Sequence, residues 1–547
     1  MDESTPPLEH QQPSGPPEAP VATPVTSEAT PKTTVPFKET SSTKKSHLWL
    51  YLIIVVVIIV VGLGIWYAVA HKSNTSTATT KKDIPLITFG YNNNPLNVFY
   101  PQYMIATSMG EQIFEGLVSF TNGTKILPDL ATSWTNPNTD TWIFTLRHNV
   151  YYHDGDVVTA QDVVYSWQQA NAQNQALASI TTSTIKNVQA VNSNTVEITT
   201  TAPDAVLLNR LTSLWIIDSK APKGTQPWEL GTGPYTVKPG TTPTANNIDL
   251  VAFNKWHGGH IYTRAINYVF YADSVKATAA LLAGKVNLID NLTTANTSQI
   301  SKNPNYQIYS PTTLFVDYLA FNTLSTGSPT ANPKIREAID LTIDPAAVLK
   351  AYGVTGTSVT QVIPPQLPGY KSAITRPAID LTIAKQLVSE AGYPNGCTIV
   401  LGVGEPAATA GQEMAKELAA VGITVKLEVA TSEGTYFNDI NNGTYQAFYE
   451  GNGSEIADAS DVLSYWQNAS FYDNPTFDAQ LTKADQTFDP AQRLTDLQQA
   501  DQTLVSDNAY IPLFQHSYTS ASNKGYVFPV YTYDNDINTF FSGVYQK

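Results

Sequence analysis

Cysteine is almost absent from this chain, which has 547 residues and a single thiol at Cys397. One thiol forms no internal disulfide and supplies no cysteine-rich metal site. An apolar run (TIVLGV) surrounds this position, so we expect Cys397 to behave as a small buried hydrophobic residue. Folds held by disulfides and cysteine-rich metal centres are therefore excluded.

Charged residues are also scarce, at 14% of the chain, and the net charge is −15. The chain beyond residue 83 has no run rich in Lys and Arg. Nucleic-acid binding needs such a basic patch to neutralise phosphates, so we expect no nucleic-acid partner. The negative charge is compatible with cationic or zwitterionic ligands, but net charge steers association and does not specify a ligand.

Motifs of common catalytic chemistry are missing as well. The sequence has neither G-x-S-x-G nor H-E-x-x-H, and its one cysteine has no evident catalytic base. Residues 402–407 (GVGEPA) imitate a dinucleotide-binding turn, but Glu405 and Pro406 occupy the positions that a pyrophosphate would approach. A carboxylate there repels phosphate, so we expect an ordinary βαβ unit, no cofactor and no enzymatic activity.

The N-terminal part of the chain has two contrasting segments. Residues 1–47 are rich in Pro, Thr, Ser and Glu, a composition that predicts a disordered tail. Leu48–Ala70 is an uncharged apolar run that, as a helix, would span about 34 Å, enough for a bilayer core. Trp and Tyr residues lie near both ends of this run, as in an aromatic belt. We predict a single transmembrane helix, followed by a polar linker at 71–83.

The stretch Leu127–Trp167 has the densest pattern in the chain. Residues 142–147 (WIFTLR) alternate apolar and polar side chains, as in a half-buried strand, and residues 153–155 (HDG) predict a turn. A helix is expected next, with Asp162 at a capping-box position. The histidine of the turn and its neighbouring carboxylates are typical of turn and capping chemistry, so we expect neither catalysis nor a metal site there.

Short motifs follow one another in a fixed order from Leu86 to Tyr518. They include IFEGL at 113–117, PDLA at 128–131, FTLR at 144–147, YHDG at 152–155, TAQDV at 159–163, GTGPY at 231–235, NKWHGG at 254–259, IREAI at 335–339 and AKQLVSEAGYP at 384–394. By these motifs the chain resembles extracellular solute-binding protein family 5, the oligopeptide- and dipeptide-binding components of ABC importers. The resemblance implies an α/β fold of the two-lobe periplasmic-binding-protein type (type II, large cluster with an extra subdomain), here preceded by a transmembrane helix.

The resemblance also implies where the domains begin and end. We expect lobe I at 84–117, 217–312 and 506–547, its subdomain at 118–216, and lobe II at 313–505. Lysines flank the apolar run on both sides, so charge does not decide the membrane orientation. A solute binder must face outward, which implies an extracellular globular part at the cell membrane and a cytoplasmic tail at 1–47.

Candidate ligand-binding residues follow from the same resemblance. In peptide-binding members an acidic residue pairs with the ligand's α-ammonium group, and the corresponding position here is Glu455, with Asp458 as the fallback. Such a charge-assisted hydrogen bond contributes about 1.5–3 kcal/mol. The strand before this loop and the lobe crossover add four further candidates, Tyr449, Asn452, Phe321 and Asn322. The alternative that the two acids are merely solvated loop residues stays open.

The function implied is a membrane-anchored receptor that binds a small solute, most simply a peptide, between two lobes and delivers it to importer permease subunits. Three alternatives remain open. In the first, the solute is an oligosaccharide or a metal chelate. In the second, the same fold serves as a sensor that signals through the inner tail. An extracellular hydrolase is the third, and the missing catalytic motifs argue against it.

Overall fold

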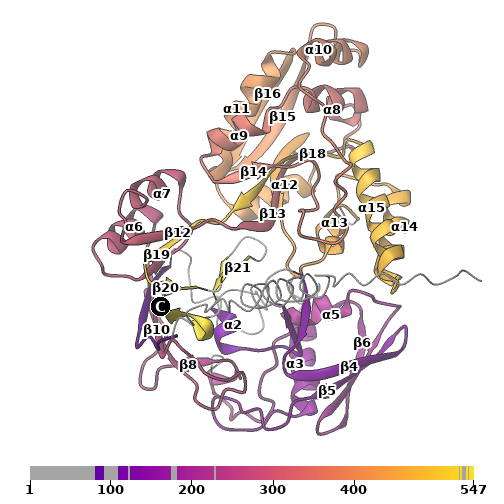
Figure 1. Ribbon diagram of the computed structural model, residues 1–547. Helices are drawn as coiled ribbons and strands as arrows, with labels where there is room; N and C mark the ends of the chain where they lie inside the picture. Colours follow the sequence, from indigo (N-terminus) through magenta and orange to yellow (C-terminus); the bar gives the residue numbers. More distant parts are fainter. Residues whose placement is uncertain are drawn as a thin grey trace, which may run out of the picture. The chain divides into compact units, whose positions relative to one another are not determined.

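The computed structural model describes residues 81–91, 109–120, 124–173, 182–226, 229–467, 469–528, 530–532, 537–539 and 541–547 (Figure 1). The predicted tail at 1–47 and the predicted membrane span Leu48–Ala70 lie outside these residues. Within the described ranges, no helix combines the length and the apolar character that crossing a bilayer requires.

A seven-stranded sheet, ordered β12-β19-β11-β1-β10-β9-β8, forms the first lobe. Its strands are β1 (Ile87–Tyr91), β8 (Tyr235–Val237), β9 (Asn247–Ala252), β10 (Ala265–Phe270), β11 (Leu288–Ile289), β12 (Tyr306–Tyr309) and β19 (Ser520–Asn523). β1 lies in the middle and runs parallel to β10 and β11. Short elements complete the lobe: α2 (Gly110–Ile113), α6 (Ser274–Leu282), α7 (Thr294–Ile300), β20 (Tyr526–Val527), β21 (Val530–Thr532), β22 (Ile537–Thr539) and β23 (Tyr545–Gln546).

The predicted subdomain contains a four-stranded antiparallel sheet, ordered β4-β5-β7-β6. Its elements are β4 (Ala131–Asn138), β5 (Thr141–Leu146), β6 (Ile185–Asn192), β7 (Thr195–Thr200) and helix α3 (Ala160–Gln173), with β2 (Val118–Phe120), β3 (Ile126–Pro128) and α5 (Leu207–Arg210) beside them. The predicted cap of α3 is confirmed, since Asp162 Oδ2 accepts hydrogen bonds from Thr159 N at 2.7 Å and Thr159 Oγ1 at 2.8 Å. Its other oxygen accepts from Ser219 N at 3.1 Å, which joins the helix start to a distant segment.

A six-stranded sheet, ordered β14-β18-β13-β17-β15-β16, forms the second lobe. Its strands are β13 (Thr312–Phe321), β14 (Gly356–Ser358), β15 (Cys397–Gly404), β16 (Ile423–Ala430), β17 (Ala447–Asn452) and β18 (Tyr510–Ser517). β15 runs parallel to β16 and β17, whereas β13 is antiparallel to both of its neighbours. The βαβ unit predicted around residues 402–407 is confirmed as β15, α11 (Ala408–Ala419) and β16.

Helices cover both faces of this sheet, so β13 is buried on both sides (Figure 1). One core contains residues of α8 (Pro333–Asp340), α9 (Pro345–Tyr352), α10 (Leu381–Glu390) and α11, and the other contains residues of α12 (Glu433–Asn441), α13 (Ala459–Gln467), α14 (Pro475–Gln486) and α15 (Pro490–Ser506). Along β13, Tyr318 and Ala320 belong to the second core and Leu319 and Phe321 to the first. Successive strand residues point to opposite faces, and both faces are buried, which explains why residues 318–321 (YLAF) are all apolar.

The chain passes between the two larger sheets at 310–311 and again at 518–519, and these two connections lie side by side. Ser310 Oγ and Thr519 Oγ1 are 2.8 Å apart, and Tyr518 N donates to Pro311 O at 3.0 Å. The second crossing comes later than the boundary at 505 that the sequence suggests. The reason is that β18 pairs with β13 through the buried apolar segment 511–514, so these residues stay in the second lobe.

A buried ion pair joins the start of α13 to α15. Arg493 donates to Asp458 Oδ2 at 2.9 Å and to Oδ1 at 2.7 Å, and also to Ser460 Oγ at 2.9 Å. Asp458 is only 4% exposed. Burial by itself would raise the pKa of Asp458, but the charge and hydrogen bonds of Arg493 outweigh it and hold this pKa below its usual value.

In several other buried carboxyl groups burial outweighs the neighbouring positive charges and hydrogen bonds, so their pKa values move the opposite way. Burial raises the pKa of Asp501 to about 7, although the Tyr510 hydroxyl, which donates to it at 3.2 Å, acts against the shift. Burial likewise raises the pKa of Glu417 to about 7 and those of Asp218 and Asp485 to about 6. Around neutral pH the folded protein therefore holds protons that the unfolded chain releases.

We expect Arg493→Ala to lower the free energy of unfolding by about 3–5 kcal/mol, because it leaves the Asp458 carboxylate buried without a partner. Urea unfolding of the full-length chain measures this loss. Lys334→Ala is the matched control, since Lys334 forms an exposed pair with Glu390 at 2.7 Å and such pairs contribute about 1 kcal/mol or less. Equal losses in both variants would contradict the structural role of Asp458.

We expect the melting temperature to fall as the pH rises from about 5 to about 8, because the carboxyls with raised pKa values stabilise the fold only while protonated. Their contribution is complete below the unfolded pKa of about 4 and is lost as the pH passes the folded values. Asp501→Asn should flatten this slope and raise the melting temperature at about pH 8. Calorimetry across this range measures both effects.

Asp496 provides a matched control on the same helix, α15. Burial would raise the pKa of Asp496, but hydrogen bonds from Lys483 at 2.8 Å and Gln492 at 2.9 Å outweigh it and lower this pKa. Asp496→Asn should therefore lower the melting temperature at both ends of the pH range. If Asp501→Asn left the dependence of the melting temperature on pH unchanged, this explanation would be wrong.

Candidate functional site

A pocket of about 430 Å³ opens at the carboxyl ends of the parallel strands β15 and β16, next to β17. In open α/β sheets, ligands bind in the crevice outside the carboxyl ends of the strands. The lining residues come from five strands, from α9 and α12 and from the turns between them: Phe315, Asp317, Tyr352, Gly404, Glu405, Pro406, Ala407, Ala430, Thr431, Ser432, Glu433, Tyr436, Phe437, Tyr449, Glu450, Gly451 and His516.

Asp317 links three strands across the floor of the pocket. The Tyr449 hydroxyl of β17 donates to Asp317 Oδ1 at 2.5 Å, and Nε2 of His516 on β18 contacts Oδ2 of the same carboxylate. Asp317 is 2% exposed. This group is therefore a rigid part of the wall, held by its neighbours before any ligand arrives.

Glu450 is a carboxylate of the pocket with one unsatisfied oxygen. Its Oε1 accepts a hydrogen bond from Gly451 N at 3.1 Å, while Oε2 is buried and has no hydrogen-bond partner among the described residues. Burial raises the pKa of Glu450 to about 8, the Gly451 N–H acts against this shift, and the charges of Asp317 and Glu433 add to it. At neutral pH the group is mostly protonated, and a cation beside it would favour ionisation.

Aromatic rings form much of the remaining wall. Phe315 lies against His516, with ring centroids 5.3 Å apart, and Tyr352 meets Tyr449 edge-on at 5.9 Å. A Cβ atom on Gly451 would lie 2.1 Å from the Phe315 ring, so only glycine allows this ring to lie over β17. Among the described lining residues there are four acids and neither Lys nor Arg, so the pocket favours apolar and cationic groups.

The structure brings only one of the predicted binding residues, Tyr449, into the lining of this pocket. Asn452 and Glu455 lie just beyond it, where Asn452 Nδ2 donates to Val462 O at 3.3 Å and Glu455 N donates to Asp461 Oδ2 at 2.7 Å. Both are partly exposed, and their role in binding stays a prediction. Asp458, the fallback, is instead the buried partner of Arg493 described above.

The two crossover candidates, Phe321 and Asn322, are both buried in the second lobe. Phe321 is 0% exposed and belongs to the core that faces α8 to α11. Asn322 is buried, and its Oδ1 accepts a hydrogen bond from Leu324 N at 3.1 Å. Neither residue lines the pocket, because β13 is covered on both faces at this end.

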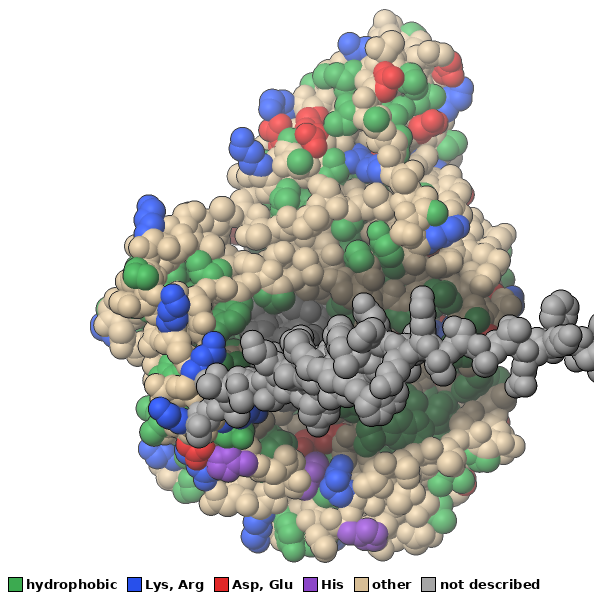
Figure 2. Space-filling model, in the orientation of Figure 1, with side chains coloured by type: hydrophobic (Ala, Val, Ile, Leu, Met, Phe, Trp, Pro, Cys, Tyr) green, Lys and Arg blue, Asp and Glu red, His purple; other side chains and the backbone are tan. Residues whose placement is uncertain are grey.

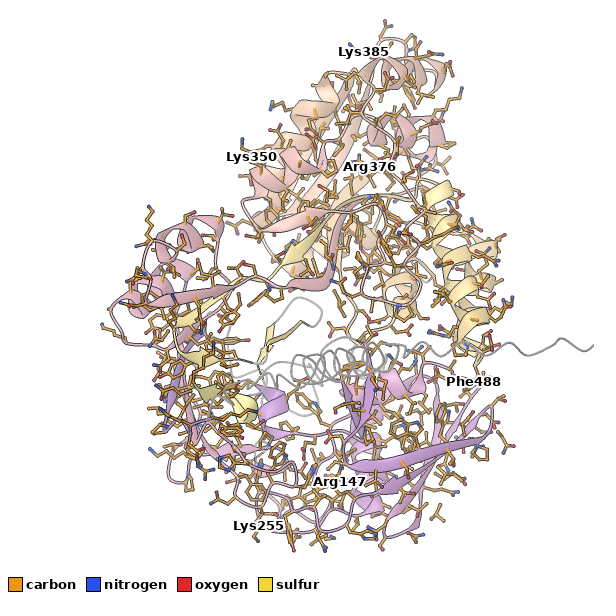
Figure 3. The ribbon with its side chains drawn as sticks, viewed as in Figure 1. Arg147, Lys255, Lys350, Arg376, Lys385 and Phe488 are labelled. Carbon is orange, nitrogen blue, oxygen red and sulfur yellow. The ribbon has the colours of Figure 1, made fainter. Side chains whose placement is uncertain are left out.

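The loop that carries Glu455 contacts the subdomain of the first lobe. Asn209 Nδ2 of α5 donates to Ile456 O at 3.0 Å, and Ala205 N donates to Asp485 O at 2.7 Å. Phe488, labelled in Figure 3, packs against the subdomain core, with its ring 6.0 Å from that of Trp142. Residues after β17 therefore lie where the second lobe and the subdomain meet.

Sequence reasoning missed Asp317, Glu450 and His516. They belong to three strands that are far apart in the chain, and no local spacing marks them as a group. Buried strands rarely contain charged residues, so the Glu in the apolar segment AFYEGN is the one feature of the sequence that could have pointed to this site.

Two clusters outside the pocket contain residues that bind metals in other proteins. Asp154, Asp156 and Asp218 come together at the predicted turn, where two of the three are exposed. Glu115, Asp129 and His257 form a second and more buried cluster. Burial and the charge of Glu115 raise the pKa of Asp129 well above its usual value, although Arg147 acts against this shift.

Comparisons with known proteins agree with the two-lobe architecture. Residues 125–474 match the family model described as bacterial extracellular solute-binding proteins, family 5 middle. Heme-binding protein A of Haemophilus influenzae is 28% identical over 521 residues, which cover 84% of this chain and 94% of that protein. The glutathione-binding protein GsiB of Escherichia coli is 26% identical over 480 residues, covering 82% and 92%.

A solved structure shares the fold. The periplasmic binding protein DppA of Helicobacter pylori, in complex with the peptide STSA, superposes with a TM-score of 0.72 at 23% identity and covers 86% of this chain and 100% of its own. The two-lobe α/β fold of a periplasmic binding protein is thereby confirmed. Family 5 consists of substrate-binding proteins of ABC importers and not of enzymes. The chain belongs to the bacterial extracellular solute-binding proteins of family 5.

Proposed function

We propose that this protein is the membrane-anchored receptor of an ABC importer and that it binds peptides, with the amino terminus of the peptide directed at the pocket of the second lobe. The observation that carries the proposal is the pocket itself, in which a buried carboxylate oxygen of Glu450 has no hydrogen-bond partner among the described residues. An α-ammonium group provides the charge and the donors that this oxygen lacks.

The surroundings of Glu450 suit a peptide for two further reasons. The rings of Phe315, Tyr352 and Phe437 offer apolar walls for side chains, and cations are attracted to aromatic faces. The peptide held by the solved DppA structure shows that this fold accommodates such a ligand in a relative.

The architecture supplies the conformational step. The lobes are joined by the paired connections at 310–311 and 518–519, and such hinges absorb the rotation of one domain against another. A ligand that touches both lobes favours the closed form, because only that form makes all of its contacts. Glu455, on the loop that meets the subdomain, would then contact the part of the peptide nearest the junction.

Membrane attachment through Leu48–Ala70 completes the proposal. In this proposal the globular part lies outside the cell, because a solute binder must face outward, and the tail at 1–47 lies in the cytoplasm. Tethering keeps the loaded receptor near the permease subunits, and this raises its effective concentration there without any new contact.

We expect Glu450→Gln to weaken the binding of a ligand peptide by about 10-fold to 100-fold, because it removes a charge-assisted hydrogen bond of about 1.5–3 kcal/mol. Native mass spectrometry of the full-length protein in detergent identifies a co-purified peptide, and calorimetry then measures its affinity. Glu428→Gln is the matched control, since Glu428 pairs with Lys426 on the surface of β16 and should not affect binding.

The pH dependence separates Glu450 from Glu455. Because its pKa is about 8 without ligand, Glu450 should release about one proton at neutral pH when an ammonium group binds, and affinity should increase between about pH 6 and about pH 7. Calorimetry in buffers of different ionisation enthalpy counts this proton. Glu455→Gln should keep the proton release. Binding that neither variant changes would rule out both carboxylates as the ammonium site.

We expect deletion of residues 48–70 to move the protein from the membrane fraction to the soluble fraction, because a run of about 20 apolar residues is the length that anchors a chain in a bilayer. Carbonate extraction followed by immunoblotting measures this. Protease added outside intact cells should digest the part after residue 71 in the full-length protein. Protection of that part, or membrane retention of the deleted form, would contradict the proposed anchor.

A further inference from the structure

Three segments that are far apart in the chain meet in the first lobe at Glu115, Asp129 and His257. Glu115 comes just after α2, Asp129 just after β3, and His257 in the turns beyond β9. One ligand atom from each lies within 4.8 Å of the others. Figure 2 shows red, purple and blue side chains together on the lower part of the molecule, near the place where Figure 3 labels Arg147.

The polar atoms of this cluster are not satisfied by one another. Glu115 is 7% exposed, and its buried Oε2 has no hydrogen-bond partner among the described residues. Nε2 of His257 lies 3.1 Å from Glu115 Oε1, yet no described atom meets hydrogen-bond geometry at this nitrogen. Buried groups of this kind cost free energy unless something else binds to them.

The distances fit a cation shared by the three side chains. Nε2 of His257 lies 3.1 Å from Glu115 Oε1 and 3.9 Å from Asp129 Oδ1. When a transition metal is bound at about 2.0–2.2 Å, two neighbouring ligand atoms lie about 3–4 Å apart. The Trp256 indole N–H donates to Glu115 Oε1 at 2.8 Å and so holds the carboxylate in place, as partners of metal ligands commonly do.

The charges around the cluster also favour a cation. Arg147 lies next to the cluster, but its guanidinium donates to the backbone oxygen of Asp129, at 3.1 and 3.3 Å, and not to the carboxyl group in these hydrogen bonds. Lys255 lies instead with its Nζ 4.8 Å from the centre of the Tyr151 ring. Within the described part of the chain, two carboxyl groups beside the Arg147 guanidinium leave room for further positive charge.

We propose that Glu115, Asp129 and His257 form a binding site for one divalent transition metal ion, with Zn²⁺ as the best fit. One imidazole and two carboxylates are ligands that Zn²⁺ accepts, whereas Ca²⁺ prefers oxygen ligands alone. The ion would join three segments of the first lobe and stabilise them together, as structural metals do. This inference is independent of the peptide proposal, since the three ligands lie outside the pocket of the second lobe.

The test uses the full-length protein in detergent, stripped of metal with EDTA and titrated with Zn²⁺. We expect one equivalent to bind and to raise the melting temperature. Glu115→Gln and His257→Gln should each weaken binding by more than about 100-fold, because even the outer partners of metal ligands account for about 10-fold to 100-fold. Co²⁺ bound in place of Zn²⁺ should give visible absorption bands, and added Ca²⁺ should not weaken them.

His260→Gln is the matched control, because His260 is three residues away, is exposed and contacts Asp83 at 2.7 Å on the surface. It should bind Zn²⁺ like the unchanged protein. Circular dichroism without metal checks that each variant is folded, and Glu115→Gln removes a buried charge and should fold at least as well. No Zn²⁺ binding, or binding that both ligand variants retain, would overturn the proposal.

Discussion

The pairing of β13 with β17 on one side and β18 on the other is the constraint on which the rest of the second lobe depends. Both faces of β13 are covered, so its register is fixed by two cores at once. A shift by one residue would exchange Tyr318 with Leu319 and would turn Asp317 away from Tyr449 and His516. The position of the pocket and the start of the crossing to the first lobe follow from this one strand.

Charged residues are scarce in this protein, and several of them are buried. Asp317, Asp458 and Asp501 are all nearly inaccessible to solvent, yet their surroundings differ. Asp458 has an arginine, Asp317 has a tyrosine and a histidine, and Asp501 has only a hydroxyl. One residue type therefore serves as an ion-pair partner, a structural acceptor and a proton holder, and the neighbours decide which.

Much of the architecture could be predicted from the sequence because it is encoded locally. The Asp162 cap, the turn at 153–155 and the βαβ unit around 402–407 each depend on residues within a short window, and each is confirmed. The pocket could not be predicted in this way, because Asp317, Glu450 and His516 meet only through strand pairing. The ion pair of Asp458, the fallback candidate for binding, could not be predicted either, because Arg493 lies 35 residues further along the chain and no local pattern links the two.

The two connections between the lobes have a mechanical consequence. Tyr518 N donates a hydrogen bond to Pro311 O and Ser310 Oγ lies against Thr519 Oγ1, so bending of one connection alone would strain these contacts. Twisting and sliding of the lobes would break these bonds, whereas folding about the line that runs through both leaves them intact. Of the possible motions between the lobes, rotation about this line is the one that these two contacts oppose least.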